Sequence, residues 1–119
     1  HPLDPTRVLD SRSTTQVGDY STPWGTATTR GVAVGGLAGV PLTADSIVAN
    51  TTVTDTTGFS FLTVWPAGVG RPTASNLNWI PGLTIANAVT VELGTSGRLA
   101  MFNLAGKVDV STDVAGWYG

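Results

Sequence analysis

The chain contains no cysteine, one histidine (at position 1), one lysine, and no run of about 18 apolar residues. The lack of cysteine excludes a disulfide framework and thiolate chemistry, without identifying a compartment. A single histidine and no cysteine leave too few ligands for zinc or copper. Because no segment is apolar over the thickness of a bilayer, insertion into a membrane is not expected.

Charge is scarce as well. Charged residues make up 12% of the 119 residues, the formal net charge is −2, and the basic residues are scattered along the chain. Binding to nucleic acid is therefore not expected, because it needs clustered basic residues that displace counterions from phosphates. Hydrophobic residues account for 41% of the chain. This is enough for one globular domain over residues 1–119, and the chain is too short for two.

What the sequence does contain is a series of short segments in which apolar and polar residues alternate, separated by Gly, Pro, Ser, Thr and Asp. No segment keeps a helical period. This pattern predicts an all-β, mostly antiparallel β-sandwich with a jelly-roll-like or immunoglobulin-like topology. The strands are expected at residues 6–12, 28–34, 47–54, 59–65, 75–79, 83–93, 98–104 and 107–119, with an extended lead-in over 1–5.

The titratable residues do not suggest catalysis. His1 at the extreme N-terminus cannot be the buried, oriented base of a Ser-His-Asp system. Asp109 and Asp113 lie four residues apart on one predicted strand face, roughly 13 Å apart by strand rise. That exceeds the carboxylate separation of glycosidases, roughly 5 to 9.5 Å. No cofactor is expected, and the two aspartates are weak candidates for a structural calcium site; a solvated edge with a salt bridge to Lys107 is the alternative.

Several polar residues lie among apolar ones, where an amide or a charge is stable only if its hydrogen bonds are made. We expect such residues to fix loops to the sandwich. They are Asp10, Arg12, Asn50, Asn87 and Asn103.

The aromatic residues suggest a binding role, since sugar rings stack their C–H faces on flat aromatic rings. Trp24 lies in a polar loop at residues 13–27 with no apolar neighbours in sequence, so it is the best candidate for an exposed platform, and Tyr20 of the same loop is a candidate to stack beside it. Trp79, at a predicted strand edge, is the second candidate. At least one tryptophan should fill the core, and Trp65 or Trp117 is expected there.

Polar groups that could bind sugar hydroxyls flank Trp79. Asn76 and Asn78 precede it by three residues and one residue, and Arg71 stands between Gly70 and Pro72. The alternative for Asn76 and Asn78 is that they fix loops across the ends of the sandwich. Arg71 is predicted either to clamp a carboxylate such as that of Asp10 or to point outward to a ligand.

Five stretches together resemble a family of β-sandwich modules that occur singly or in tandem in exported actinobacterial proteins, often C-terminal to hydrolases or on surface proteins. The resemblance covers nearly the whole chain, but the loop with Tyr20, Pro23 and Trp24 has no counterpart in it. It implies export, attachment to other domains and a non-catalytic role. The stretches are Arg7–Arg12, Leu62–Gly68, Arg71–Asn78, Ala86–Val91 and Asp109–Tyr118.

The preferred hypothesis is therefore a non-catalytic, lectin-like carbohydrate-binding module of a secreted or cell-surface protein, which holds an enzyme or a cell at a polysaccharide. The alternative is a structural spacer or adhesion module that contacts protein or cell wall without a defined sugar site. The exposure of the tryptophans separates the two hypotheses, because a spacer should bury all four or expose them only at contacts between domains.

Overall fold

The computed structural model describes residues 1–119 and consists almost entirely of β-strands. A single 3₁₀ turn, Thr95–Gly97, is its only helical element. The strands are β1 (Pro2–Asp10), β2 (Thr28–Ala33), β3 (Ser46–Thr54), β4 (Ser60–Pro66), β5 (Leu77–Trp79), β6 (Ile85–Glu92), β7 (Arg98–Asn103) and β8 (Asp109–Tyr118).

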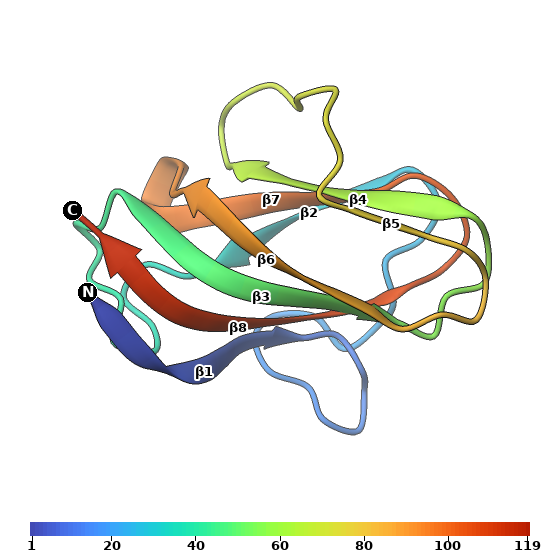
Figure 1. Cartoon of the computed structure of the whole chain (residues 1–119), viewed down its shortest axis with the longest axis horizontal. Helices are drawn as coiled ribbons and strands as arrows, with labels where there is room; N and C mark the ends of the chain where they lie inside the picture. The colour runs from blue at the N-terminus through green and yellow to red at the C-terminus, as the bar shows by residue number, and fades with distance from the viewer.

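The strands form two four-stranded antiparallel sheets, ordered β1-β8-β3-β6 and β2-β7-β4-β5, which pack face to face (Figure 1). The pairing is nested: β1 pairs with β8, β2 with β7, β3 with β6, and β4 with β5. It is as if one long hairpin had been rolled up, which is the arrangement of a jelly roll. The predicted all-β sandwich is confirmed, and of the two topologies expected the jelly roll is the one observed.

Alternation along the strands explains which residues form the core. On β3, Ile47, Ala49 and Val53 are buried, while Val48 and Asn50 face away from the other sheet. On the opposite sheet, Leu62 and Val64 of β4 point inward. Because successive side chains on a strand point to opposite faces, each strand contributes every second residue to the space between the sheets. As the alternation of the sequence predicts, Val110 and Val114 of β8 lie in the same core.

All strand boundaries except the start of the first strand lie within two residues of those predicted. The first strand begins at Pro2 rather than at Thr6, because the lead-in pairs with the end of β8, and register shifts between Pro2 and Thr6 and between Arg7 and Leu9 accommodate the irregular stretch. The strand predicted over 83–93 is shorter, since Leu83 is exposed in a turn that precedes Ile85.

Buried and edge amides connect the loops, as expected for two of the three asparagines. Asn103 is fully buried: its Oδ1 accepts from the Ser60 hydroxyl at 2.7 Å, and its Nδ2 donates to the carbonyls of Gly25 and Gly106. Asn87 of β6 donates to the carbonyl of Asn76 at 2.9 Å and so joins the edges of the two sheets. The prediction for Asn50 is wrong, because its side chain is exposed on the outer face of β3 and makes no hydrogen bond.

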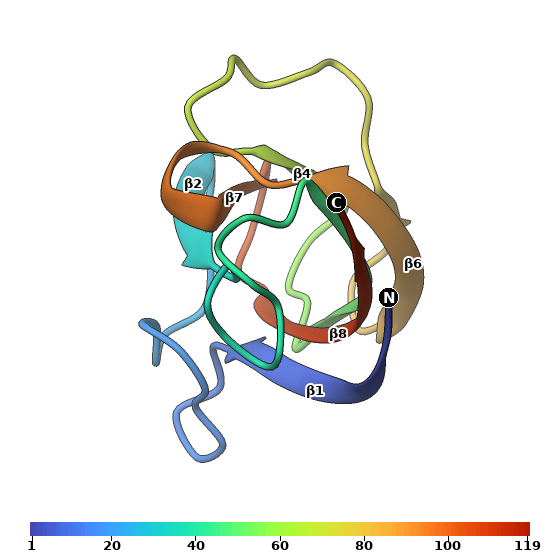
Figure 2. The same cartoon turned by 90° about the vertical axis from the view of Figure 1, so that its left-hand side faces the viewer.

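The first and last residues lie at the same end of the sandwich (Figures 1 and 2). The N-terminal ammonium of His1 donates to the carbonyl of Trp117 at 2.9 Å, and the two rings stack with centroids 3.9 Å apart. The turns β3–β4, β5–β6 and β7–β8 lie at the opposite end. No helix in the structure has the length and apolar character needed to cross a membrane.

Candidate functional site

Trp24 is not an exposed platform: the structure buries it completely. Its backbone pairs with Val108 in both directions, at 2.8 and 3.1 Å, and its indole N–H donates to the carbonyl of Met101 at 3.0 Å. The prediction is wrong because the polar loop around Trp24 folds back over the edge of the sandwich. Its apolar neighbours are distant in sequence and close in space.

Tyr20 belongs to the same structural cluster. Its hydroxyl donates to the carbonyl of Gly31 at 2.7 Å, and its ring meets Trp24 edge-on. The guanidinium of Arg30 lies 4.7 Å from the centre of the Tyr20 ring and 4.6 Å from that of Trp24, while it also donates to Thr22 and Pro23. Tyr20 and Arg30 therefore fix the loop over residues 20–24 against β2, and the guanidinium of Arg30 lies over the Tyr20 ring that was predicted to stack on a sugar.

The other tryptophans are distributed differently from the prediction. Trp79 points into the core and is 5% exposed, so it cannot stack on a sugar either. Trp65 packs on the outer side of its sheet in a small separate cluster with Ala100 and Phe102. Trp117 is half-buried beside His1. The tryptophans that fill the core are thus Trp24 and Trp79, the two expected to be exposed, rather than Trp65 or Trp117.

The outer face of β4 and β7 carries phenylalanines, which the sequence analysis did not single out. Phe61 of β4 and Phe102 of β7 lie side by side on the outer face of their sheet, with ring centroids 6.1 Å apart. Asn78 of β5 is the cross-strand partner of Phe61 and is exposed on the same face. Phe59 and Ile80 adjoin the last pair of these two strands, Ser60 and Trp79, and their side chains are 72% and 50% exposed.

A loop over residues 67–76 covers part of this outer face, and Figures 1 and 2 both show it on the side of β4 away from the other sheet. Its carbonyls accept from the face below it, Val69 from the Trp65 indole at 2.9 Å and Ala74 from the Thr63 hydroxyl at 3.1 Å. The Asn76 side chain accepts from the backbone N–H of Val64 at 2.7 Å. Asn76 therefore holds the loop in place and is not available as predicted for a sugar hydroxyl.

Arg71 stands on this loop, with its guanidinium carbon 3.7 Å from the centre of the Phe102 ring. It clamps neither Asp10 nor another carboxylate, and none of its N–H groups makes a hydrogen bond in the structure. Asn78 keeps its amide N–H groups free, while its Oδ1 accepts from Ser75 at 3.1 Å. We call the surface formed by Phe59, Phe61, Arg71, Asn78, Ile80 and Phe102 the phenylalanine face.

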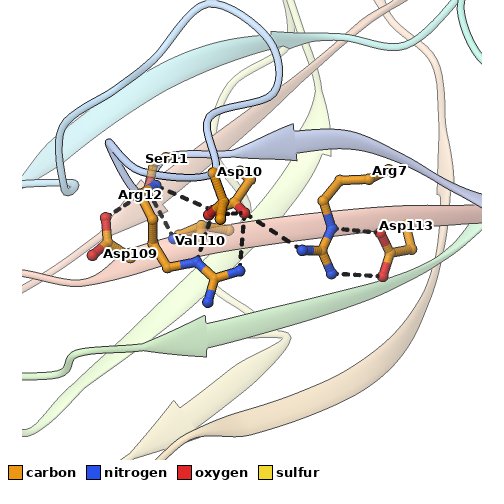
Figure 3. A network of polar contacts seen from close by, with 8 residues as sticks. Arg7, Asp10, Ser11, Arg12, Asp109, Val110 and Asp113 are labelled. Atoms are coloured by element: carbon orange, nitrogen blue, oxygen red, sulfur yellow. Dashed lines mark hydrogen bonds and ion pairs between the residues drawn. The ribbon is translucent and has the colours of Figure 1, made fainter.

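The outer face of the other sheet carries a network of charged residues whose partners are all within the chain (Figure 3). Arg7 donates to both oxygens of Asp113, at 2.8 and 3.1 Å. Arg12 binds both oxygens of the buried Asp10 at 3.0 and 2.9 Å. The Arg12 hydrogen bonds, partly opposed by burial, hold the pKa of Asp10 well below its usual range. The structural role expected of Asp10 and Arg12 is confirmed.

Asp109 lies apart from this pairing. It is buried, accepts from the Ser11 hydroxyl at 2.9 Å, and makes no salt bridge with Lys107. Burial raises its pKa; the Ser11 hydrogen bond opposes this shift, and the neighbouring carboxyl group of Asp55 adds to it. Asp109 and Asp113 do not converge, and no group of three acidic or histidine side chains is arranged to hold a metal ion.

The largest hollow, of about 390 Å³, lies along β1 beside the loops at residues 17–19 and 37–38. Tyr20 lines a narrower hollow of about 50 Å³ that adjoins it. The cation in the larger hollow, Arg7, is already held by Asp113. A further hollow of about 260 Å³ lies between His1 and Tyr118. None of these hollows contains Arg71, Asn76, Asn78 or either predicted tryptophan.

No protein-family model matches the chain, and no curated protein matches it. The assignment of a function therefore depends on the chemistry of the surfaces described above.

Proposed function

We propose that this protein is a non-catalytic carbohydrate-binding module and that it binds polysaccharide through the phenylalanine face. The observation that supports this most directly is that Phe61 lies beside Asn78, with Arg71 on the neighbouring Phe102. The apolar C–H face of a sugar needs an aromatic ring, and its hydroxyls need donors and acceptors at the edge of that ring. The phenylalanine face supplies both on one exposed surface.

Each residue of the face has a separate role in this proposal. Phe59 and Phe61 stack on sugar rings, and Asn78 and Arg71 donate hydrogen bonds to ring substituents. Asn76 positions the loop that carries Arg71 and does not contact the ligand. Phe102 is 6% exposed beneath Arg71 and supports the guanidinium rather than a sugar.

The proposal also covers where the module is located and what it is attached to. The family resemblance of the sequence motifs, and a composition rich in Thr, Gly, Ala and Val, favour a secreted or cell-surface protein. In such a protein the module would be attached to other domains and would keep an enzyme or a cell at the polysaccharide.

A structural spacer or adhesion module is the second candidate, and one observation favours it. Trp24, Trp65 and Trp79 are all buried, as expected of a domain whose aromatic residues serve only to hold it together. In that case the phenylalanine face would contact protein or cell wall without selecting a sugar.

A glycan array and a polysaccharide pull-down on the purified chain distinguish the two candidates. Phe59→Ala and Asn78→Ala are the test variants, because both residues are exposed and their loss leaves the core intact. Tyr118→Ala is the control, an aromatic residue that is 55% exposed at the opposite end of the sandwich. Binding to one class of polysaccharide that both test variants weaken and the control retains would support the carbohydrate site. No binding across a broad panel would favour the spacer.

A further inference from the structure

Arg71 differs from the other four arginines of the chain. Arg7, Arg12 and Arg98 each pair with an aspartate. Arg30 donates to Thr22 and Pro23. Arg71 alone has neither an ion pair nor a hydrogen bond, although it is exposed and its guanidinium presents five donors.

The guanidinium is nevertheless held in one place. Its carbon lies 3.7 Å from the centre of the Phe102 ring, a cation–π arrangement that is attractive in itself. The loop that carries it is fastened on both sides, by Trp65 to Val69 before Arg71 and by Thr63 to Ala74 after it. A guanidinium fixed in this way loses little conformational freedom when it binds a planar anion through two N–H groups.

Acidic residues are absent from the whole of this sheet. Strands β2, β4, β5 and β7 and the loop over residues 67–76 contain no aspartate or glutamate, whereas the other sheet contains five acidic residues. A chain with a net charge of −2 thus presents one sheet whose only charges are positive. The five acidic residues of the other sheet are Asp4, Asp10, Glu92, Asp109 and Asp113.

From the unpaired, immobilised Arg71 on a sheet without acidic residues, we infer that the ligand of the phenylalanine face is an acidic polysaccharide, whose uronate carboxylate pairs with Arg71. This inference rests on the proposed carbohydrate binding and names the class of sugar. The pyranose ring stacks on Phe61, and the planar carboxylate accepts two N–H groups of Arg71. A neutral sugar would leave these donors to water and would gain no charge interaction.

The test compares acidic polysaccharides with chemically matched neutral forms. Polygalacturonate, alginate and hyaluronan are each measured by affinity electrophoresis or calorimetry beside their methyl esters, in which the uronate carboxylate is esterified, so that the backbone is kept and the negative charge is removed. Because a hydrogen-bonded charge contributes about 1.5–3 kcal/mol, esterification should weaken binding about tenfold or more. Arg71→Gln should reduce binding of the acid to the level of the ester. Arg71→Lys keeps the positive charge but lacks the paired N–H donors of the guanidinium. Its affinity for the acid should lie between that of the unaltered protein and that of Arg71→Gln.

Arg98→Gln is the matched control, since Arg98 is on the same sheet but already pairs with Asp19 at 3.4 Å. The affinity of this variant for the acidic polysaccharide should equal that of the unaltered protein. Equal binding of acid and ester, or tight binding to neutral polysaccharides only, would overturn the uronate inference while leaving the carbohydrate-binding proposal intact. Binding to dextran sulfate that is unaffected by Arg71→Gln would show general ion exchange and would also overturn it. Failure to bind any polysaccharide would overturn both the uronate inference and the carbohydrate-binding proposal.

Discussion

Arg12 holds Asp10 through both carboxylate oxygens, with Nε donating to one at 3.0 Å and Nη2 to the other at 2.9 Å. The Thr15 hydroxyl adds a third hydrogen bond at 2.8 Å. Asp10 is completely buried by these partners and ends β1 at the point where the chain leaves the sheet. The carboxylate is stable in this position only in its charged form, because every group around it donates.

Acid should therefore destabilise the protein through Asp10. Its pKa is lower in the folded than in the unfolded chain, so the unfolded state binds the proton first, and the stability contributed by Asp10 at neutral pH is lost as the pH falls below about 4. Asp10→Asn should lower the free energy of unfolding at pH 7 by about 1–3 kcal/mol and flatten the loss of stability below about pH 4. Urea titrations at several pH values measure both effects. Parallel pH profiles for the two proteins would contradict this.

Asp109 should have the opposite dependence. Burial and Asp55 raise its pKa above that of the unfolded chain, so the folded state binds the proton more tightly. The stability that this residue contributes is present at low pH and is lost as the pH rises from about 4 through the raised pKa. Asp109→Asn keeps an oxygen for the Ser11 hydroxyl and should remove this decline, with a small gain in stability at pH 7. Asp55→Asn should reduce the decline. A steeper decline in Asp109→Asn would show that the carboxylate is stabilising.

Trp24 should behave as a core residue. Trp24→Ala removes a fully buried ring and should lower the free energy of unfolding by about 3–5 kcal/mol. Trp24→Phe keeps an aromatic ring but removes the indole N–H that donates to the Met101 carbonyl. It should lower the free energy of unfolding by less than Trp24→Ala does. Chemical denaturation followed by tryptophan fluorescence measures both, with Tyr118→Ala expected to change stability by less than about 0.5 kcal/mol. A stable Trp24→Ala protein that had lost polysaccharide binding would restore the original interpretation of Trp24.

Two glycines should respond very differently to alanine. A Cβ on Gly94 would overlap the backbone of Ala67, where the chain after β6 passes the end of β4. Gly94→Ala should therefore lower stability by about 1–3 kcal/mol, because a backbone segment must move. A Cβ on Gly70 meets nothing within 4 Å, and Gly70→Ala should be neutral within about 0.5 kcal/mol. Thermal unfolding of the two variants measures this difference. Equal unfolding midpoints for Gly94→Ala and Gly70→Ala would contradict the tight packing of Gly94 against Ala67.

The strands were predictable because alternation is a local property. Ile47, Ala49 and Val53 could be assigned to one face from their spacing alone, and the same holds for Val110 and Val114. Trp24 could not be placed in this way. Its neighbours in sequence are Pro23 and Gly25, and its burial depends on contact with Val108 and Met101, which lie more than 70 residues further along the chain.

The candidate site was only partly predictable for a related reason. Arg71 and Asn78 were recognised as polar groups beside aromatic residues, but the analysis concentrated on tryptophan. A signal for the phenylalanine face was present in β4, where Phe61 and Trp65 alternate with Leu62 and Val64, so that both faces of one strand are apolar. One of those faces must lie outside the main core, and Phe61 and Trp65 occupy it.

The nested pairing of the strands also determines when this domain can fold. The first strand is hydrogen-bonded to the last, with Pro2 opposite Gly116 and Asp10 opposite Ser111, so the sheet that contains β1 cannot be completed until the final residues are available. Contacts between such distant segments slow folding, because the chain must be ordered over almost its whole length before they form. Only β4 and β5, joined by the loop that carries Arg71, pair over a short distance in sequence. We therefore expect a slow folding domain in which the β4–β5 hairpin forms early and β1 docks on β8 in the last step.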